Sequence, residues 1–150
     1  MKRRLLSILL AVSVLLGLLV IPVSAGSTTS EGGFFYNVYD GKAEICGYEN
    51  PNVTELTIPA TLGGSPVGYL TENCFKDFTK LKKVVLPDCL EGIYPQAFWN
   101  CTSLEEINLP DGVTIGADAF LDCTSLKEIY IPANSHGTHR GGAFTGCTGL

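Results

Sequence analysis

Cysteine and histidine are the residues of this sequence best suited to chemistry, as nucleophiles, metal ligands or disulfide partners. The chain of 150 residues contains 6 Cys and 2 His, and His136 and His139 form an H-x-x-H spacing that could hold a metal ion. No Glu follows the first His, as the H-E-x-x-H motif of metalloproteases requires, and the segment is rich in Gly rather than helical. The sequence therefore favours a solvated loop over a metal site.

Motifs for catalysis or phosphate binding are missing from the sequence. It contains neither the G-x-S-x-G turn of hydrolases nor a glycine loop that would bind phosphate after a strand. A Cys–His enzyme is disfavoured as well, because Cys101, Cys123 and Cys147 recur in step with a longer repeat. We therefore predict no catalytic residue, no metal ion and no cofactor, and an exported hydrolase is the least favoured function.

The repeat that positions these cysteines is the strongest signal in the chain. The pattern L-x-x-[VI]-x-[LI]-P occupies residues 81–87, 104–110 and 126–132, at spacings of 23 and then 22 residues. A second marker, Ala-Phe followed by Cys three residues after the Phe, keeps the same register. Its three copies are Ala97-Phe98 with Cys101, Ala119-Phe120 with Cys123, and Ala143-Phe144 with Cys147. A fixed period of this length is typical of a solenoid, in which each repeat is one coil stacked on its neighbours.

Each coil has a simple physical interpretation. In residues 104–110 the apolar side chains point inward from a short strand, and Pro110 ends the strand because it has no N–H to donate. Ala119-Phe120 is expected on a short helical turn. Equivalent side chains then stack into a continuous core, with the columns Leu86, Leu109, Ile131 and Phe75, Phe98, Phe120, Phe144. The predicted fold is a repeat solenoid, α/β but mostly β, built of stacked parallel short strands with short helical turns.

The three cysteines of the repeat fill the same slot in successive coils. Stacked coils lie about 4.8 Å apart, a separation at which a disulfide could form. Side chains at equivalent positions point in parallel rather than toward each other, and Phe78 fills the slot in the preceding coil. We therefore predict buried free thiols that act as small hydrophobes, and we interpret Cys74 in the same way. Cys46 and Cys89 are unassigned, and a bond between them is left open.

The first 25 residues are predicted to be a signal peptide for export. Three basic residues at 2–4 precede an apolar run, Pro22 breaks it, and residues 23–25 fit the small-x-small cleavage rule. The competing interpretation is an uncleaved anchor, because the apolar run approaches the length that spans a bilayer. The cleavage site favours a secreted product without membrane insertion. Cleavage leaves 7 basic and 15 acidic residues, a net charge of −8, which argues against nucleic acid as a partner.

The segments between the export signal and the repeats are predicted to form a linker and a cap over the first coil. Residues 26–33 are rich in Ser, Thr and Gly and are expected to form a flexible linker. Residues 34–52 contain two β-prone runs joined by Asp40-Gly41, which favours a two-residue hairpin turn. We expect this β-hairpin to cap the first coil, because a terminal coil would otherwise expose apolar side chains.

The outward face of the stacked strands is the candidate binding surface. Its residues alternate with the inward ones, and they are Glu55, Thr57, Lys83, Val85, Glu106, Asn108, Glu128 and Tyr130. One interpretation is that the Glu and Lys positions only pair charges across strands, at about 0.2–1 kcal/mol per pair. The other is that Tyr130, Asn108 and Val85 begin a recognition stripe, because an exposed Tyr is a favourable anchor.

The combined pattern L-x-x-[VI]-x-[LI]-P and A-F-x-x-C-T-x-L, as in residues 104–110 and 119–126, resembles the BspA-type leucine-rich repeat of bacterial surface proteins. The resemblance covers residues 53–150 in about four repeats, so that 34–150 would form one leucine-rich-repeat domain. It implies a solenoid on an exported protein, and the family is associated with attachment to proteins and cell surfaces. Residues 133–140 depart from the pattern, and we expect a looser coil there. The resemblance does not transfer a ligand.

The sequence leads to two main hypotheses of function. The first is an exported, non-enzymatic module that binds a protein or cell-surface ligand, in adhesion or recognition at the cell surface. The alternative is a structural stalk, or the N-terminal fragment of a longer surface solenoid. Leu150 begins a further copy of the repeat, so we expect that the chain continues or self-associates through this uncapped end. Residues 128–132 would then be an unprotected edge strand.

Overall fold

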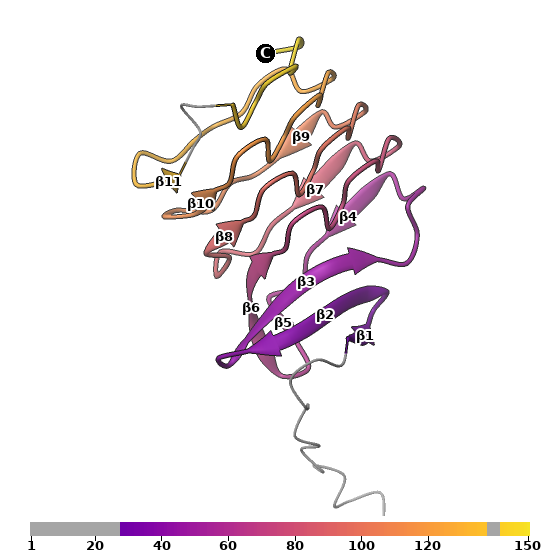
Figure 1. Cartoon of the computed structure of the whole chain (residues 1–150), viewed down its shortest axis with the longest axis vertical. Helices are drawn as coiled ribbons and strands as arrows, with labels where there is room; N and C mark the ends of the chain where they lie inside the picture. Colours follow the sequence, from indigo (N-terminus) through magenta and orange to yellow (C-terminus); the bar gives the residue numbers. More distant parts are fainter. Residues whose placement is uncertain (1–27, 138–141) are drawn as a thin grey trace, which may run out of the picture.

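The structure, a computed structural model, describes residues 28–137 and 142–150. The predicted signal peptide over 1–25 and His139 of the H-x-x-H spacing lie outside the described residues. Within them, the chain winds into coils stacked along one axis, with an antiparallel hairpin at the N-terminal end of the stack (Figure 1). The described residues contain no helix, and therefore none that could cross a membrane.

One sheet, called here the long sheet, follows the whole stack and contains eight strands. It begins with three antiparallel strands, β1 (Thr29–Glu31), β2 (Phe34–Tyr39) and β3 (Lys42–Tyr48). It continues with parallel strands from successive coils, β6 (Ser65–Leu70), β8 (Gly92–Ile93), β10 (Thr114–Ile115) and β11 (His136–Gly137). The remaining strand, β5 (Thr61–Leu62), pairs antiparallel with β6.

A second sheet, called here the short sheet, has three parallel strands on another side of the coils. They are β4 (Glu55–Thr57), β7 (Lys83–Val85) and β9 (Glu106–Ile107). Their registers place Leu56, Val84 and Ile107 at equivalent positions, and all three are buried. The prediction of stacked parallel short strands with inward apolar residues is therefore confirmed.

The N-terminal hairpin of β2 and β3 forms as predicted, and an additional strand, β1, precedes it. Asp40 and Gly41 have φ values of 50° and 74°, the two positive values that a type I′ turn requires. The expected linker over 26–33 is wrong for Thr29–Glu31, because these residues form β1 and pair with β2. Without β1 the edge of β2 would leave its backbone groups unpaired, and Gly32-Gly33 supply the turn between the two strands.

The turns that carry the Phe side chains differ from the predicted helical turns. Each contains two residues in the left-handed region, as in Gln96 (φ 60°) and Asn100 (φ 61°), and this conformation interrupts a helix. Along this turn every second backbone N–H donates to the next coil, as Phe98 N does to Ala119 O at 2.8 Å. A helix would use such donors for its own hydrogen bonds. Here they form a ladder of backbone hydrogen bonds between successive coils instead. Asn, Asp, Gln and Gly occupy these left-handed positions in the four coils, and Asn and Asp tolerate them best after Gly.

The core contains the predicted column of Phe rings. Phe75, Phe98 and Phe120 are fully buried, and Phe144 continues the column from the last coil. Successive ring centroids are 5.3, 5.4 and 5.3 Å apart, and the last two pairs are parallel within 6°. This column holds the coils at a constant spacing and confirms the register of the repeat.

The repeat cysteines line the core beside this column. Each thiol donates to the carbonyl of a Phe in the preceding coil: Cys101 to Phe75 at 3.2 Å, Cys123 to Phe98 at 3.2 Å, and Cys147 to Phe120 at 3.0 Å. All three are buried, and the described residues contain six free cysteines and no disulfide.

The cysteines outside this slot are free as well. The bond left open between Cys46 and Cys89 is not formed. The Cys89 thiol instead lies 3.4 Å from Ala60 O and 3.5 Å from Val67 O, in an exposed turn. Burial raises the pKa of Cys46, and it raises the pKa of the buried Cys74 far more, so that the Cys74 thiol stays protonated at any ordinary pH.

Residues 128–132 form no strand, so the predicted edge strand there is wrong. The short sheet ends at β9, one coil earlier. The reason lies in the next turn, where Ser135 and Gly137 replace the inward Val113 and Ile115 of the preceding coil. The Ser135 hydroxyl is buried without a partner among the described residues, so this coil has less apolar surface to hold it on the stack.

Candidate functional site

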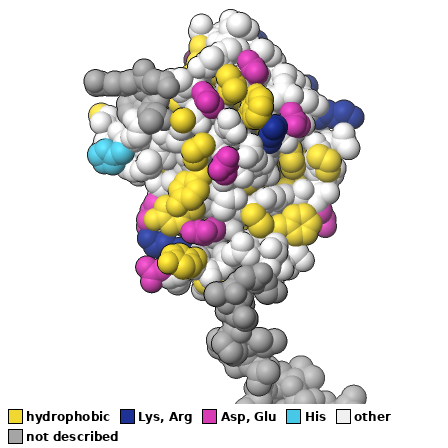
Figure 2. Space-filling view, in the orientation of Figure 1, with side chains coloured by type: hydrophobic (Ala, Val, Ile, Leu, Met, Phe, Trp, Pro, Cys, Tyr) yellow, Lys and Arg dark blue, Asp and Glu magenta, His cyan; other side chains and the backbone are white. Residues whose placement is uncertain are grey.

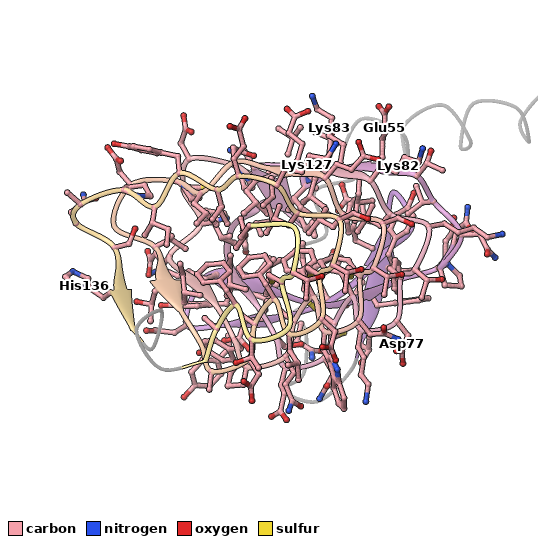
Figure 3. The ribbon with its side chains drawn as sticks, turned by 90° about the horizontal axis from the view of Figure 1, so that it is seen from above. Glu55, Asp77, Lys82, Lys83, Lys127 and His136 are labelled. Atoms are coloured by element: carbon pink, nitrogen blue, oxygen red, sulfur yellow. The ribbon has the colours of Figure 1, made fainter. Side chains whose placement is uncertain are left out.

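The eight residues of the candidate binding surface lie on one face of the coils, called here the short-sheet face. Glu55 and Lys83 project from the same side of the molecule in Figure 3. Register pairs Glu55 with Lys83 and Lys83 with Glu106, and it pairs Thr57 with Val85. Lys83 is half-buried and the other seven residues are exposed. The alternation predicted from the sequence therefore places all eight on the surface, although Glu128 and Tyr130 lie beyond the last strand.

Two charged side chains on this face are paired with each other. Lys83 Nζ lies 2.7 Å from Glu106 Oε1, across β7 and β9. The hydrogen bond to Glu106 raises the pKa of Lys83, so the ammonium is charged at neutral pH. Both side chains are accessible to solvent, at 41% for Lys83 and 66% for Glu106, and such surface pairs contribute little to stability. The pair fits the interpretation that these positions match charges between coils.

Asn108 has a role that the sequence did not suggest. Its side-chain amide donates to Leu86 O at 3.0 Å and accepts from Leu86 N at 2.7 Å, so that it binds both backbone groups of one residue in the preceding coil. In the preceding pair of strands the matching donor, Ile58 N, bonds to the backbone carbonyl of Val85. Asn108 thus continues the ladder beyond β9 with its side chain, and one N–H group and the oxygen of its amide are engaged within the protein.

The remaining residues form the part of the face that is open to a ligand. Tyr130 is 78% exposed and Val85 is 37% exposed. An open groove of about 440 Å³ lies beside the Tyr130 ring, and its lining residues are Glu105, Glu106, Ile107, Glu128, Ile129 and Tyr130. The groove combines an aromatic ring, an apolar floor and three carboxylates. It could accommodate an extended segment that carries apolar and basic side chains.

A second group of exposed residues lies on the long sheet, and the sequence analysis missed it. Lys42 Nζ lies 2.6 Å from each carboxylate oxygen of Glu91, and Tyr69 donates to the same carboxylate at 2.8 Å. Tyr94 packs against Tyr69, with 5.6 Å between ring centroids. Lys42, Tyr69 and Glu91 lie 22 to 49 positions from one another in the sequence, so only the register of the long sheet brings them together.

Metal ligands do not cluster among the described residues, and the one ion pair with shifted pKa values on the long sheet is held charged. The described residues contain no group of three or more His, Cys, Asp or Glu side chains that could hold a metal ion. His136 lies exposed on β11. The hydrogen bond from Lys42, and then that from Tyr69, lowers the pKa of Glu91, while the hydrogen bond to Glu91 raises the pKa of Lys42. Both groups are thereby held in their charged forms, whereas a general acid or base needs a pKa near the working pH.

Comparisons with known proteins agree with this geometry. The profile of the BspA-type leucine-rich-repeat region, described as six copies, matches residues 45–150. A leucine-rich-repeat protein from Bacteroides capillosus is 32% identical, with a TM-score of 0.67 over 73% of this chain and 85% of that chain. No curated protein is a significant match in sequence.

Two further crystal structures extend the comparison. A leucine-rich cell surface protein from Faecalibacterium prausnitzii is 30% identical, with a TM-score of 0.65 over 77% of this chain, which spans about a third (32%) of that protein. The leucine-rich-repeat protein of T. pallidum is 26% identical, with a TM-score of 0.63 over 83% of this chain and 69% of that chain. With the family profile matched over more than half of its length, the chain belongs to the BspA-type leucine-rich-repeat family.

Proposed function

We propose that this chain is an exported, non-enzymatic module that binds a protein ligand through the short-sheet face, at the cell surface. The observation that carries the proposal is the groove beside Tyr130, whose ring is the most exposed large hydrophobic side chain of the described residues. Leaving a large ring in water costs free energy, and an exposed aromatic residue beside a groove is a typical anchor at interfaces.

The chemistry of the face favours a protein ligand. The residues beside the groove include the carboxylates of Glu105, Glu106 and Glu128, and within residues 28–137 and 142–150 only that of Glu106 has a cationic partner. A basic side chain of a partner could pair with Glu128 while its stem packs on the ring of Tyr130. The net charge of −8 after signal cleavage disfavours nucleic acid and favours a partner with a basic patch.

Export and surface location complete the proposal. The basic start, apolar run and small-residue site of the first 25 residues support export. The similar protein from Faecalibacterium prausnitzii is described as a cell surface protein, which supports the same location here. N-terminal sequencing of the secreted protein should begin at or near Gly26. A product that keeps Met1 and sediments with membranes would contradict export by cleavage.

A structural role is the second candidate, and the face itself provides its support. Lys83 and Glu106 bind each other, and Asn108 binds the backbone of Leu86. Three of the eight outward residues therefore connect neighbouring coils. A stalk would need such contacts along the whole face, whereas a binding module needs them only at the margin of its site.

Site-specific photo-cross-linking separates the two candidates. A photoreactive amino acid replaces Tyr130 or Val85 on the short-sheet face, and Lys80 serves as the control because it is exposed in a different turn. The full chain is secreted from its own cells and irradiated in culture. A binding module should yield one discrete cross-linked protein from the face positions and none from position 80.

The partner identified in this way allows a quantitative test. Tyr130→Ala should weaken the binding between this partner and the purified chain by about tenfold or more, as expected for an interface anchor. The unfolding midpoint of the variant should stay near that of the wild type. Cross-links at every position, or none at the face, would reject the binding module and leave the structural role.

A further inference from the structure

A separate cluster of exposed side chains lies on the long sheet and belongs to no function described so far. The cluster, called here the tyrosine patch, consists of Tyr39, Lys42, Tyr69, Glu91 and Tyr94. Its residues come from β2, β3 and β6 and from the two ends of β8. Figure 2 shows hydrophobic side chains interleaved with acidic and basic ones on this flank, above the turn between β2 and β3. The long and short sheets occupy different sides of the coil, as His136 and Lys83 show in Figure 3.

Two tyrosines of the patch are exposed, and two of its rings pack against each other. Tyr39 is 72% exposed and Tyr94 is 42% exposed. The Tyr94 ring lies 5.6 Å from that of Tyr69, with 45° between the ring planes. Lys42 is opposite Tyr39 in the hairpin, and its ammonium lies 5.7 Å from the centre of the Tyr69 ring. The patch therefore presents ring surface and a charged group within one small area.

The charged groups of the patch neutralise each other. The Lys42 ammonium bonds both oxygens of Glu91, each at 2.6 Å, and the Tyr69 hydroxyl donates to one of them at 2.8 Å. The ammonium and the carboxylate are part-exposed, so that unused N–H groups and oxygen lone pairs still face solvent. The patch thus has hydrogen-bond donors and acceptors held in place, and with the carboxylate of Asp40 also acting on Lys42 it carries no excess of positive charge.

Two glycines in the strands make this arrangement fit. A Cβ atom at Gly68 would lie 2.9 Å from Cδ of Lys42, and one at Gly92 would lie 3.0 Å from Cδ1 of Tyr69. Glycine inside a strand weakens it, and it often marks a place where another group must approach closely. Here both glycines lie under side chains of the patch, so the strands give up local stability where these side chains lie flat.

We propose that the tyrosine patch binds a carbohydrate, by stacking of an uncharged pyranose ring on the exposed tyrosine rings. One face of a pyranose carries C–H groups, which pack on an aromatic ring, while its rim carries hydroxyls. Those hydroxyls can donate to Glu91 and accept from Lys42. An acidic peptide or an anionic lipid would require unpaired positive charge, and Lys42 provides none because it is paired with Glu91.

Saturation-transfer difference NMR with defined hexasaccharides tests the inference on the secreted chain. The probes are cellohexaose, mannohexaose and N-acetylchitohexaose, each added separately. We expect at least one of them to receive saturation on its ring C–H protons. Tyr94→Ala should lower the affinity by roughly tenfold, and Tyr94→Phe, which keeps the ring, should retain most of it.

Matched controls make each outcome decisive. Tyr130→Ala removes an even more exposed tyrosine from the short-sheet face and should leave the saccharide signal unchanged. The folding of each variant is checked by its unfolding midpoint. The inference is overturned if none of the three hexasaccharides receives saturation, or if Tyr94→Ala retains the full signal. A photo-cross-link from position 94 to a protein, with no saccharide signal, would assign the patch to a protein partner instead.

Discussion

The column of Phe rings and the short-sheet face run along the same stack and follow opposite rules. In the column, the four coils carry the same residue, and the ring centroids repeat at 5.3 to 5.4 Å. On the face, one row reads Glu, Lys, Glu, Glu and the next reads Thr, Val, Asn, Tyr. A buried ring must match the shape of its neighbours above and below, whereas an outward side chain meets mainly water. The period is therefore strict only where coils are packed together.

This difference shows which residues can change in evolution without loss of the fold. A change in the column alters the packing of two interfaces between coils, so it lowers the stability of the fold. A change on the face leaves the packing intact, and it can alter recognition alone. Mutations in the two regions should therefore separate into losses of folding and losses of binding.

The largest loss of stability is expected from Phe120→Ala. The Phe120 ring lies between those of Phe98 and Phe144, at 5.4 and 5.3 Å, and is fully buried. Its removal should lower the free energy of unfolding by about 3–5 kcal/mol, measured by chemical denaturation. Tyr130→Ala is the control on the face and should cost less than about 0.5 kcal/mol. Similar losses for both variants would mean that the column does not hold the stack.

The thiol slot beside the column should show a smaller effect. Cys123→Ala removes a buried sulfur and its hydrogen bond to Phe98 O, at an expected cost of about 1–2 kcal/mol. In the folded wild type, a thiol reagent should react first with the exposed Cys89, and with Cys101, Cys123 and Cys147 only after unfolding. Rapid modification of the three buried thiols in the native protein would contradict their assignment to the core.

The same thiols predict how stability depends on pH. The neighbouring thiol and burial raise the pKa values of Cys123 and Cys147 above that of a free thiol, about 8.5. Above this pH the unfolded chain loses thiol protons that the folded chain keeps, so stability should fall as the pH rises. The double variant C123A/C147A should show a shallower fall between pH of about 8 and 10. An equal slope in both proteins would show that other groups cause it.

Asn108 tests the boundary between the two regions. Although it lies on the face, its amide makes two hydrogen bonds to Leu86. Asn108→Ala should therefore lower the free energy of unfolding by about 1–2 kcal/mol. Thr57→Ala, in the same row of the face, should stay within about 0.5 kcal/mol of the wild type. If the two variants are equally stable, Asn108 is free for recognition after all.

The sequence predicted the features that depend on stacking. The Phe column, the cysteine slot, the inward strand residues and the Asp40-Gly41 turn each have a local or periodic signal. β1 has none, because Thr29–Glu31 pair only through the open edge of β2. The left-handed turns were missed, although Gln96, Asp118 and their equivalents directly precede the Ala of the second marker in the sequence.

The surface sites were harder to predict for a different physical reason. An outward Asn looks the same in the sequence whether its amide faces water or, like that of Asn108, the backbone of the next coil. The tyrosine patch combines residues from the hairpin with residues two coils away, so that Lys42 meets Glu91 across 49 positions. Such a contact depends on the register of the long sheet and leaves no periodic trace. Outward orientation could be predicted from the sequence, but the partners of each outward side chain could not.

The smallest effect on stability is expected for Lys83→Ala. Both ends of the Lys83–Glu106 pair are accessible to solvent, and water and salt replace the lost partner at little cost. The unfolding midpoint should therefore not change measurably. Loss of the ammonium leaves Glu106 unpaired beside the groove and makes the face more acidic, so a basic partner should associate faster at low salt. Association rates of the cross-linked partner, measured at low and high salt, check this prediction. A clear loss of stability with an unchanged association rate would place the pair among the contacts that hold the coils together, and would support the structural role for the face.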